Sequence, residues 1–340
     1  MTNSRLPKIT LEEAYEHPDT VRGHLASEED LRRLLDSVGL TPQYYRRVGE
    51  RLAEFDDMRL ASMDAAGIEH QIISLTAPGI QIIADPAEAT AEARQQNDFL
   101  AGQVARHPDR YSGFAAVALQ DPEGAGKELR RAVDDLGFKG VLVNGYTNVG
   151  DLEHGRYLDH PAYYLFWEVL AELDVPLYLH PRPPLPGGQA GLFQGHQEMV
   201  GATWGFGTET ATHAVRLLLS GHFDRFPATK LIIGHMGEAL PALLWRTQSM
   251  FDLNPGDKKI KKTLPEYFAD NIWITTSGNF SDHALITAVL AVGADHILFS
   301  VDYPYADNVD GAAWIEHAPI SELDRRKIAH SNARALFGLG

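Results

Sequence analysis

The chain has 340 residues, of which 44% are apolar and 22% are charged, an ordinary composition for a globular protein. Lys and Arg number 30 and Asp and Glu number 46, so the net charge is −16. This charge argues against binding to nucleic acid or to an anionic membrane, because both require a basic surface. The absence of cysteine excludes disulfides, thiolate metal ligands and cysteine nucleophiles. The first residues lack the apolar segment of a signal peptide and no run of 18 apolar residues occurs, so we expect a cytoplasmic protein.

Short β-branched or aromatic runs recur along the chain and predict eight strands: Lys8–Leu11, Gln71–Ser74, Gly113–Val117, Gly140–Val143, Leu177–His180, Leu231–Gly234, Ile272–Thr275 and Ile297–Ser300. Amphipathic helical patterns separate most of them, such as Glu123–Leu136, Tyr163–Leu173, Thr210–Leu219 and Asp282–Val292. This alternation predicts right-handed βαβ units and a parallel sheet. Eight units favour an α/β fold of the (β/α)8 or TIM-barrel type, as a single domain over residues 1–340.

An open, doubly wound sheet is the alternative architecture. Such a sheet normally binds a nucleotide through a glycine-rich loop after its first strand. Here the first strand is followed by Glu12-Glu13-Ala14-Tyr15, which contains no glycine. The usual sequence signatures of phosphate-binding loops, nicotinamide binding, hydrolase nucleophile elbows and zinc peptidases are also absent, so the closed barrel is favoured.

Two segments exceed ordinary connections. Residues 16–56 follow the first strand and contain helical patterns over Glu28–Val38 and Pro42–Phe55. Residues 181–208 follow the fifth strand and are rich in Pro, Gly, Trp and Phe. Both insertions come at the carboxyl ends of strands, the face where barrel enzymes build their active sites. We therefore expect them to form lids, substrate walls or oligomer contacts.

Polar residues stand directly at the ends of four predicted strands. Glu12 follows strand one, His180 ends strand five, His235 follows strand six and Asp302 follows strand eight. Taken singly, a strand-end His is often bonded to backbone and a strand-end Asp often caps a helix. In a barrel, however, all four side chains converge on one mouth, and this set of oxygen and nitrogen ligands predicts a mononuclear divalent-metal site.

Another histidine allows two interpretations. His213 lies on an amphipathic segment with Glu209 one turn earlier. An ion pair between residues four apart explains it without chemistry, and a role in the site is the alternative.

Several motifs, in order along nearly the whole chain, match one known family: Lys8-Ile-Thr-Leu-Glu-Glu-Ala-Tyr15, Arg59-Leu-Ala-Ser-Met-Asp-Ala-Ala-Gly67, Leu75-Thr-Ala-Pro-Gly79, Gly137-Phe-Lys-Gly140, Leu179-His-Pro181, Gly234-His-Met-Gly-Glu238, Thr275-Thr-Ser-Gly-Asn279, Ser300-Val-Asp-Tyr-Pro304 and Asn332-Ala-Arg-Ala-Leu-Phe337. With them the chain resembles the metal-dependent aromatic-acid decarboxylases of the amidohydrolase superfamily, which are relatives of aminocarboxymuconate-semialdehyde decarboxylase. The branch it resembles contains the 2,3-dihydroxybenzoate, γ-resorcylate, salicylate and 5-carboxyvanillate decarboxylases.

The resemblance implies a role for each matching residue. Glu12, His180 and Asp302 correspond to the ligands of one divalent metal ion per subunit, Zn²⁺, Mn²⁺ or Mg²⁺. Asp302 also corresponds to the aspartate that delivers a proton. His235 and Glu238 correspond to a His-x-x-Glu pair beside the substrate, so all three are expected to be catalytic.

Two arginines also match the family. Arg59 and Arg246 correspond to arginines that hold the substrate carboxylate, and the second reaches in from a neighbouring subunit, which implies a homodimer or homotetramer.

One position departs from the pattern of the family. Hydrolytic members and γ-resorcylate decarboxylases have a histidine two residues after the first acid, whereas this chain has Ala14. The substitution favours the dihydroxybenzoate, salicylate and carboxyvanillate branches, and an oxygen-rich ligand set in which Mg²⁺ or Mn²⁺ competes with Zn²⁺.

The expected reaction is the reversible, non-oxidative decarboxylation of an ortho-hydroxybenzoic acid such as 2,3-dihydroxybenzoate. A metal that chelates the carboxylate and the ortho hydroxyl would acidify the phenol, and a protonated Asp302 would deliver a proton to the ring carbon. The alternative is a hydrolase of the same superfamily that opens a lactone or an amide. A third possibility is a protein that binds a metal or an aromatic acid without turnover.

Overall fold

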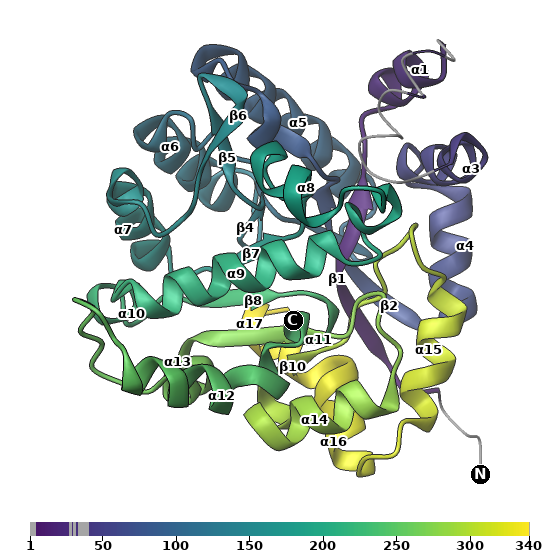
Figure 1. Ribbon diagram of the computed structural model, residues 1–340. Coiled ribbons are helices and arrows are strands. Elements are labelled where there is room, and N and C mark those ends of the chain that lie inside the picture. Colours follow the sequence, from purple (N-terminus) through teal and green to yellow (C-terminus); the bar gives the residue numbers. More distant parts are fainter. Residues whose placement is uncertain (1–4, 27–28, 30–31, 33–40, 340) are drawn as a thin grey trace.

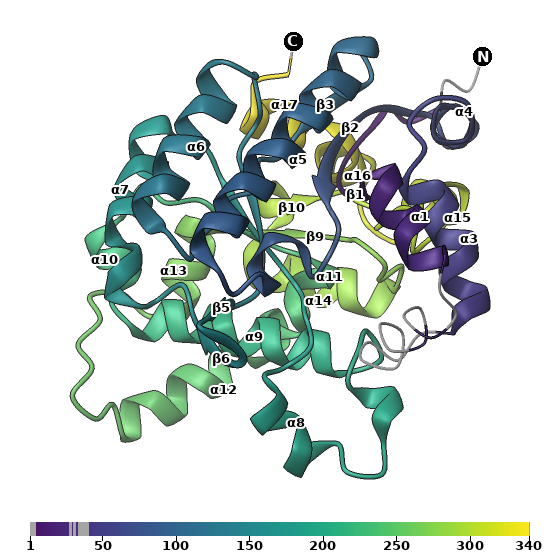
Figure 2. The same ribbon diagram turned by 90° about the horizontal axis from the view of Figure 1, so that it is seen from above.

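The computed structural model describes residues 5–26, 29, 32 and 41–339 and shows eight parallel strands surrounded by helices (Figures 1 and 2). The strands are β1 (Lys8–Tyr15), β2 (Ile68–Leu75), β3 (Tyr111–Gly113), β4 (Val141–Asn144), β7 (Leu177–His180), β8 (Leu231–Ile233), β9 (Ile272–Thr275) and β10 (Ile297–Leu298). They pair in the orders β1-β2-β3 and β4-β7-β8-β9-β10. A bridge from Ala115 to Val141 joins the two groups. The amide of Ala14 donates to the carbonyl of Tyr303 over 2.7 Å and joins β1 to the segment after β10, so the predicted (β/α)8 barrel is confirmed.

Helices cover the outside of the barrel and follow the strands in the predicted alternation. Their bounds are α1 (Pro18–Ala26), α3 (Pro42–Leu52), α4 (Asp57–Ala66), α5 (Pro86–Arg106), α6 (Pro122–Asp134), α7 (Tyr164–Leu173), α8 (Pro186–Leu192), α9 (Gly205–Leu219), α10 (His222–Arg225), α11 (His235–Glu238), α12 (Leu240–Leu253), α13 (Leu264–Asn271), α14 (Asp282–Val292), α15 (Asn308–His317), α16 (Glu322–Arg326) and α17 (Asn332–Phe337). Short turns of other helix types lie at Gly79–Ile82, Pro161–Tyr163, Gln197–Met199, Ala294–His296 and Lys327–Ser331.

The strands bury both faces, as parallel barrel strands do. Alternate residues pack inward and outward along each strand, because side chains of a strand point to opposite faces. In β4 and β8, Leu142 and Ile232 belong to the cluster inside the barrel, which Phe337 of α17 also joins. Val143 and Ile233 belong to the larger cluster between the strands and the helices. This double core holds the strand ends at fixed positions.

The insertion after β1 contains α1 and α3. The predicted helical pattern Pro42–Phe55 is observed as α3, whose first turn is capped by Thr41. The other predicted pattern, Glu28–Val38, falls almost entirely outside the described residues. The insertion after β7 forms α8 and leads into α9. In Figure 1, α1, α3 and α8 all lie on the side of the barrel toward which β1 runs.

Two features differ from the sequence-based expectations. The third strand is Tyr111–Gly113, so it shares only Gly113 with the predicted strand Gly113–Val117, and beyond it Ala115 alone forms an isolated bridge. An antiparallel hairpin, β5 (Thr147–Val149) and β6 (Asp151–Arg156), follows β4 and was not predicted. Within the part of the chain that the structure describes, we find no helix with the length and apolar character needed to cross a membrane.

Candidate metal centre and active site

Glu12 lies at an irregularity in β1. The pairing of β1 with β2 shifts register between Thr10 and Glu13, which marks a bulge. The amides of Leu11 and Glu12 both donate to Ser300 Oγ, at 3.2 and 2.7 Å. The bulge directs the Glu12 side chain into the mouth of the barrel, where only 2% of it is exposed.

The two carboxylate oxygens of Glu12 have different surroundings. Oε2 accepts hydrogen bonds from the hydroxyls of Tyr178, Ser277 and Thr275, which come from β7, from the loop after β9 and from β9. Oε1 is buried and has no hydrogen-bond partner among the residues that the structure describes. It lies 3.5 Å from His180 Nε2 and 3.7 Å from His235 Nε2. A buried carboxylate oxygen without a partner is costly unless a cation or a ligand satisfies it.

Glu12, His180 and Asp302 together form the predicted ligand group. One ligand atom of each lies within 4.8 Å of the others. His180 Nδ1 donates a hydrogen bond to the carbonyl of Pro181 at 2.9 Å, and Nε2 is therefore free to face Glu12. Burial lowers the pKa of His180 to about 4, so the imidazole is neutral at pH 7, as a metal ligand must be. The unpartnered Oε1 and this donor set fit a divalent metal ion.

His235 and Glu238 lie on a left-handed turn. Residues 235–239 all have positive φ, and four of them are not glycine: His235, Met236, Glu238 and Ala239. The turn places His235 Nδ1 at 2.8 Å from Glu238 Oε1. Although burial lowers the pKa of His235, the carboxylates of Glu12 and Glu238 outweigh it and hold that pKa well above the usual value. Left-handed backbone outside glycine is rare and concentrates at functional sites.

Asp302 completes the group from the segment after β10. Its backbone is also left-handed, with φ +74°. Its Oδ2 lies 3.7 Å from His235 Nε2. Burial raises the pKa of Asp302 to about 7, in part against the opposing effect of the neighbouring His235. A carboxyl group that can hold a proton near neutral pH therefore lies beside a histidine and next to the candidate metal ligands.

Arg59 of α4 lies in the interior of the protein. Its side chain is fully buried, and the guanidinium donates to the carbonyls of Ala14 and Glu54 at 2.7 and 3.1 Å. Its carbon lies 4.8 Å from the centre of the Tyr303 ring. Arg59 thus lies behind β1 among backbone carbonyls and aromatic rings, and its Nη1 is buried without a hydrogen-bond partner among the described residues. Its role in holding a substrate carboxylate stays a prediction.

Arg246 is an exposed residue of α12, almost two turns beyond the end of the left-handed turn. Among the described residues it has no hydrogen bond or ion pair. About 10 Å of helix separates it from Ala239 at the end of the left-handed turn. Its predicted role requires a second subunit.

The structure also corrects the interpretation of His213 and adds Asn144 to the residues near the site. His213 does not pair with Glu209; its Nε2 accepts the amide proton of Leu158 at 2.8 Å. Asn144, the last residue of β4, pairs in register with His180, and its Oδ1 is buried without a partner. Asn144 directly follows the predicted strand Gly140–Val143, which is the only signal for it in the sequence, because an uncharged amide at a strand end does not by itself indicate a metal site.

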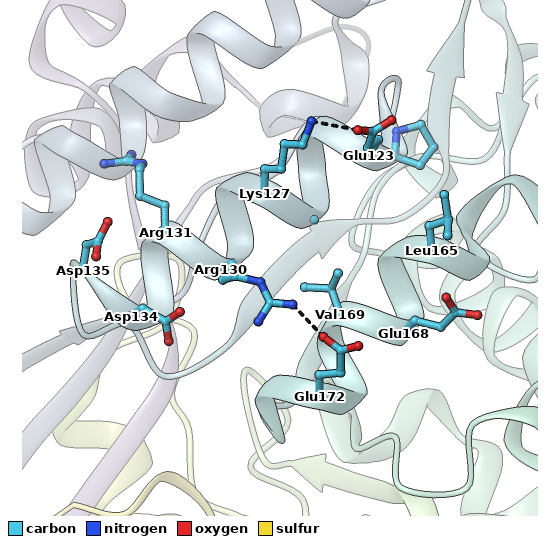
Figure 3. Close-up of a pocket in the computed structure, with 12 residues that line it drawn as sticks. Glu123, Lys127, Arg130, Arg131, Asp134, Asp135, Leu165, Glu168, Val169 and Glu172 are labelled. Carbon is cyan, nitrogen blue, oxygen red and sulfur yellow. Dashed lines mark hydrogen bonds and ion pairs between the residues drawn. The ribbon is translucent and has the colours of Figure 1, made fainter.

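A separate groove lies on the outside of the barrel between α6 and α7 (Figure 3). Four of its charged side chains are paired with each other: Lys127 with Glu123 at 2.7 Å and Arg130 with Glu172 at 2.6 Å. None of the candidate metal ligands lines it. The candidate active site is therefore the barrel mouth, and this groove is a feature of the surface.

Residues 19–339 match the family model described as amidohydrolase. The chain belongs to the amidohydrolase family. A γ-resorcylate decarboxylase from Polaromonas sp. is 47% identical over 98% of both chains. The structure of a 2,6-dihydroxybenzoate decarboxylase in complex with 2,6-dihydroxybenzoate is similar with a TM-score of 0.91 and 43% identity, covering 98% of this chain and 99% of that one. A dihydroxybenzoic acid decarboxylase from Polaromonas sp. with bound manganese and 2-nitroresorcinol has a TM-score of 0.90 and 44% identity, with 98% and 97% covered.

Within the amidohydrolase family, overall similarity opposes the branch preference drawn from Ala14. A 5-carboxyvanillate decarboxylase from Sphingomonas paucimobilis is 35% identical, below the 47% of the γ-resorcylate enzyme. Ala14 instead packs against Val48 and Leu52 of α3. The residue at this position reflects the packing of the inserted helix, and it does not assign the branch.

Proposed function

We propose that this protein is a metal-dependent decarboxylase that catalyses the reversible, non-oxidative decarboxylation of an ortho-hydroxybenzoic acid, with 2,6-dihydroxybenzoate as the favoured substrate. The observation that carries the proposal is the group Glu12, His180 and Asp302 beside the His235–Glu238 pair. The similarity to γ-resorcylate decarboxylases over 98% of the chain supports the choice of substrate. The example named from the sequence, 2,3-dihydroxybenzoate, becomes a comparison compound.

The ligand atoms offered to the metal are Glu12 Oε1, His180 Nε2 and a carboxylate oxygen of Asp302. Manganese is the favoured ion, because two of the three ligands are carboxylates and relatives of known structure hold manganese. When bound, the ion supplies an electrostatic anchor for the substrate's carboxylate and ortho-hydroxyl oxygens and lowers the pKa of that hydroxyl.

Asp302 supplies the proton in this proposal. Its carboxyl proton moves to the ring carbon that carries the carboxylate, the bond from that carbon to the carboxyl carbon breaks, and carbon dioxide leaves with the aromatic ring restored. The resulting Asp302 carboxylate lies beside His235, whose imidazole can return a proton to it. Glu238 holds His235 through Nδ1, which keeps Nε2 directed toward Asp302.

We further infer that the active protein is a homodimer or homotetramer in which Arg246 serves a neighbouring subunit. Arg246 shares one exposed stripe of α12 with Leu243, Met250 and Leu253, which follow one another at helical spacing. Leu243 is 48% exposed and Leu253 is 77% exposed. An exposed apolar stripe with a cation in its middle is a typical subunit contact.

The decisive experiment measures carbon dioxide release from 2,6-dihydroxybenzoate, 2,3-dihydroxybenzoate, salicylate, 5-carboxyvanillate and 4-hydroxybenzoate, with protein loaded with Mn²⁺, Mg²⁺ or Zn²⁺. We expect turnover of ortho-hydroxy acids only.

Asp302→Asn should lower kcat by about 10²–10⁴-fold, the usual contribution of a general acid. Asp310→Asn, at an exposed position of α15, is the matched control and should retain full activity. Hydrolysis of lactones without carbon dioxide release would instead favour the hydrolase.

A further inference from the structure

Glu13 is a second carboxylate at the mouth of the barrel, and no role in metal binding is assigned to it. It is fully buried. Its Oε1 accepts the Ser300 hydroxyl and the Val301 amide, both at 3.1 Å, and its Oε2 accepts the Tyr303 amide at 2.9 Å. Every one of these partners is a donor, so the ionised carboxylate satisfies all of them.

These donors surround the proton-donating residue. Val301 and Tyr303 are the two neighbours of Asp302 in the chain, and Asp302 itself is left-handed. β10 ends at Leu298, so this segment is not held by a strand ladder. The amides on either side of Asp302 converge on one carboxylate, while the carbonyls of Val301 and Tyr303 accept the amides of Gly278 and Ala14. Together these contacts hold the left-handed backbone of the residue between them.

The same contacts close the barrel. β1 and β10 are not neighbours in either sheet, so this seam lacks a regular ladder among the described residues. Ser300 Oγ accepts the amides of Leu11 and Glu12 and donates to Glu13. The segment that carries Asp302 is thereby joined to the bulge that carries Glu12. Arg59 lies behind this arrangement, bonded to the carbonyl of Ala14 and packed on the Tyr303 ring.

We propose that Glu13 is a positioning residue: by accepting the amides on both sides of Asp302, it sets the direction of the Asp302 carboxylate for proton transfer. This inference rests on the proposed function for its kinetic consequence. Small displacements of a reacting group lower the rate far more than they weaken substrate binding, and a misplacement of about 1 Å can cost about 10²-fold. Glu13 therefore acts on kcat through Asp302 and makes no contact with substrate.

The test is Glu13→Gln in the manganese-loaded protein. Glutamine has the same shape, but it must turn its amide NH2 toward either the Tyr303 amide or the pair Ser300 and Val301. We expect kcat for 2,6-dihydroxybenzoate to fall about 10–100-fold, KM to stay within about threefold and one manganese to remain bound per subunit. An unchanged kcat in the folded, loaded variant would overturn the proposal.

Glu316→Gln is the matched control. Glu316 pairs with the buried Lys8 at the opposite end of β1, at 2.5 Å, so its loss also disturbs a buried charge on this strand. We expect the control to lower the melting temperature while kcat remains unchanged. An equal loss of kcat in both variants would show a general structural effect and overturn the positioning role. If Glu13→Gln does not fold, Ser300→Ala removes one of the three donors and should lower kcat with KM unchanged; an unchanged kcat overturns the proposal.

Hydrogen exchange separates this inference from the proposed function. If the wild-type protein releases no carbon dioxide from any acid, the proposed function fails, and exchange of the backbone over residues 300–304 still tests the contact. Exchange there should be at least about tenfold faster in Glu13→Gln than in Glu316→Gln. Equal exchange in the two variants would show that Glu13 does not hold this segment.

Discussion

At the barrel mouth, short distances between the backbone and neighbouring side chains determine which residue fits at a given position. The carboxylate of Glu12 lies directly over Gly234, the residue before the left-handed turn. A Cβ at Gly234 would lie 2.7 Å from Glu12 Oε2, 2.9 Å from Oε1 and 3.0 Å from the Tyr178 hydroxyl. Glycine is therefore required here by space, because any side chain would displace the ligand oxygen and its hydrogen-bond donor.

Gly234→Ala is expected to weaken manganese binding by about 10–100-fold, the usual effect of disturbing a group that orients a metal ligand. Titration of the metal-free protein with Mn²⁺ measures this. Gly102→Ala is the control, because a Cβ on this exposed position of α5 meets nothing within 4 Å. It should leave the affinity unchanged and raise stability by about 0.5–1 kcal/mol. Equal affinities in the two variants would contradict the proposed contact.

At the scale of elements, the left-handed turn at residues 235–239 is the least expected feature. Each non-glycine residue in this conformation costs about 1–2 kcal/mol. The turn is nevertheless what brings His235 and Glu238, three residues apart, into contact on the side that faces Asp302. Packing against α12 and β9 maintains the turn. The turn therefore lowers the free energy of unfolding relative to a turn without left-handed non-glycine residues.

Ala239→Gly should relieve part of this strain. Ala239 is exposed, has φ +63° and ψ −1°, and contributes no side-chain hydrogen bond to the turn. We expect the free energy of unfolding to rise by about 1 kcal/mol, measured by chemical denaturation. Ala91→Gly, at an exposed position within α5, should lower it by about 1 kcal/mol. A loss of stability in both variants would show that the turn is not strained at Ala239.

Two buried histidines in α9 and α10 make these elements sensitive to acid. Burial lowers the pKa of His213 and of His222 to about 3. Both are neutral in the folded protein at pH 5, whereas they take up protons in the unfolded chain below about pH 6.5. The contribution of these two histidines to the free energy of unfolding is thus fully present above about pH 6.5 and is lost as the pH falls toward 3.

We predict a loss of up to about 1.4 kcal/mol per pH unit for each of these histidines between pH 6 and 4. His222 has no hydrogen-bond partner at either ring nitrogen and packs on Trp167 with 4.2 Å between ring centres. His222→Phe should therefore reduce the pH dependence by about one proton in this range. Denaturation at a series of pH values gives both slopes, and identical slopes would contradict the prediction.

At the scale of the whole molecule, α12 links the candidate site to an exposed apolar stripe. The helix begins directly after the left-handed turn and contacts α13 and α14 along the lower side of Figure 1. Its exposed stripe carries Arg246, and Trp245 next to it is 77% exposed. If two subunits meet through this stripe, Arg246 lies in the contact between them.

Mixing two inactive variants tests this arrangement. Arg246→Ala and Asp302→Asn should each lose activity alone. If Arg246 acts on a neighbouring subunit, a mixed dimer contains one site with both native residues, and about a quarter of wild-type activity should return after unfolding and refolding together. If Arg246 acts within its own chain, no mixed dimer contains a complete site and activity stays absent. Light scattering establishes the oligomeric state of each preparation.

The sequence by itself determined the barrel and the candidate metal ligands. Eight apolar runs alternating with helical patterns imply parallel strands, and the carboxyl ends of parallel strands meet at one rim. Glu12, His180 and Asp302 could therefore be placed together although 290 positions separate the first from the last. The predicted His235–Glu238 pair is also in contact.

The tertiary structure decided what local sequence does not contain. The bulge at Glu12 and the contacts of Glu13 depend on Ser300, 288 positions from Glu12. The burial of Arg59 depends on Tyr303, and the left-handed turn depends on packing against β9. Periodicity reports which face of an element is apolar, whereas these features arise from hydrogen bonds and contacts between elements far apart in the chain. The residues of the candidate site could be predicted from the sequence, whereas the position of Asp302 depends on the contacts that close the barrel.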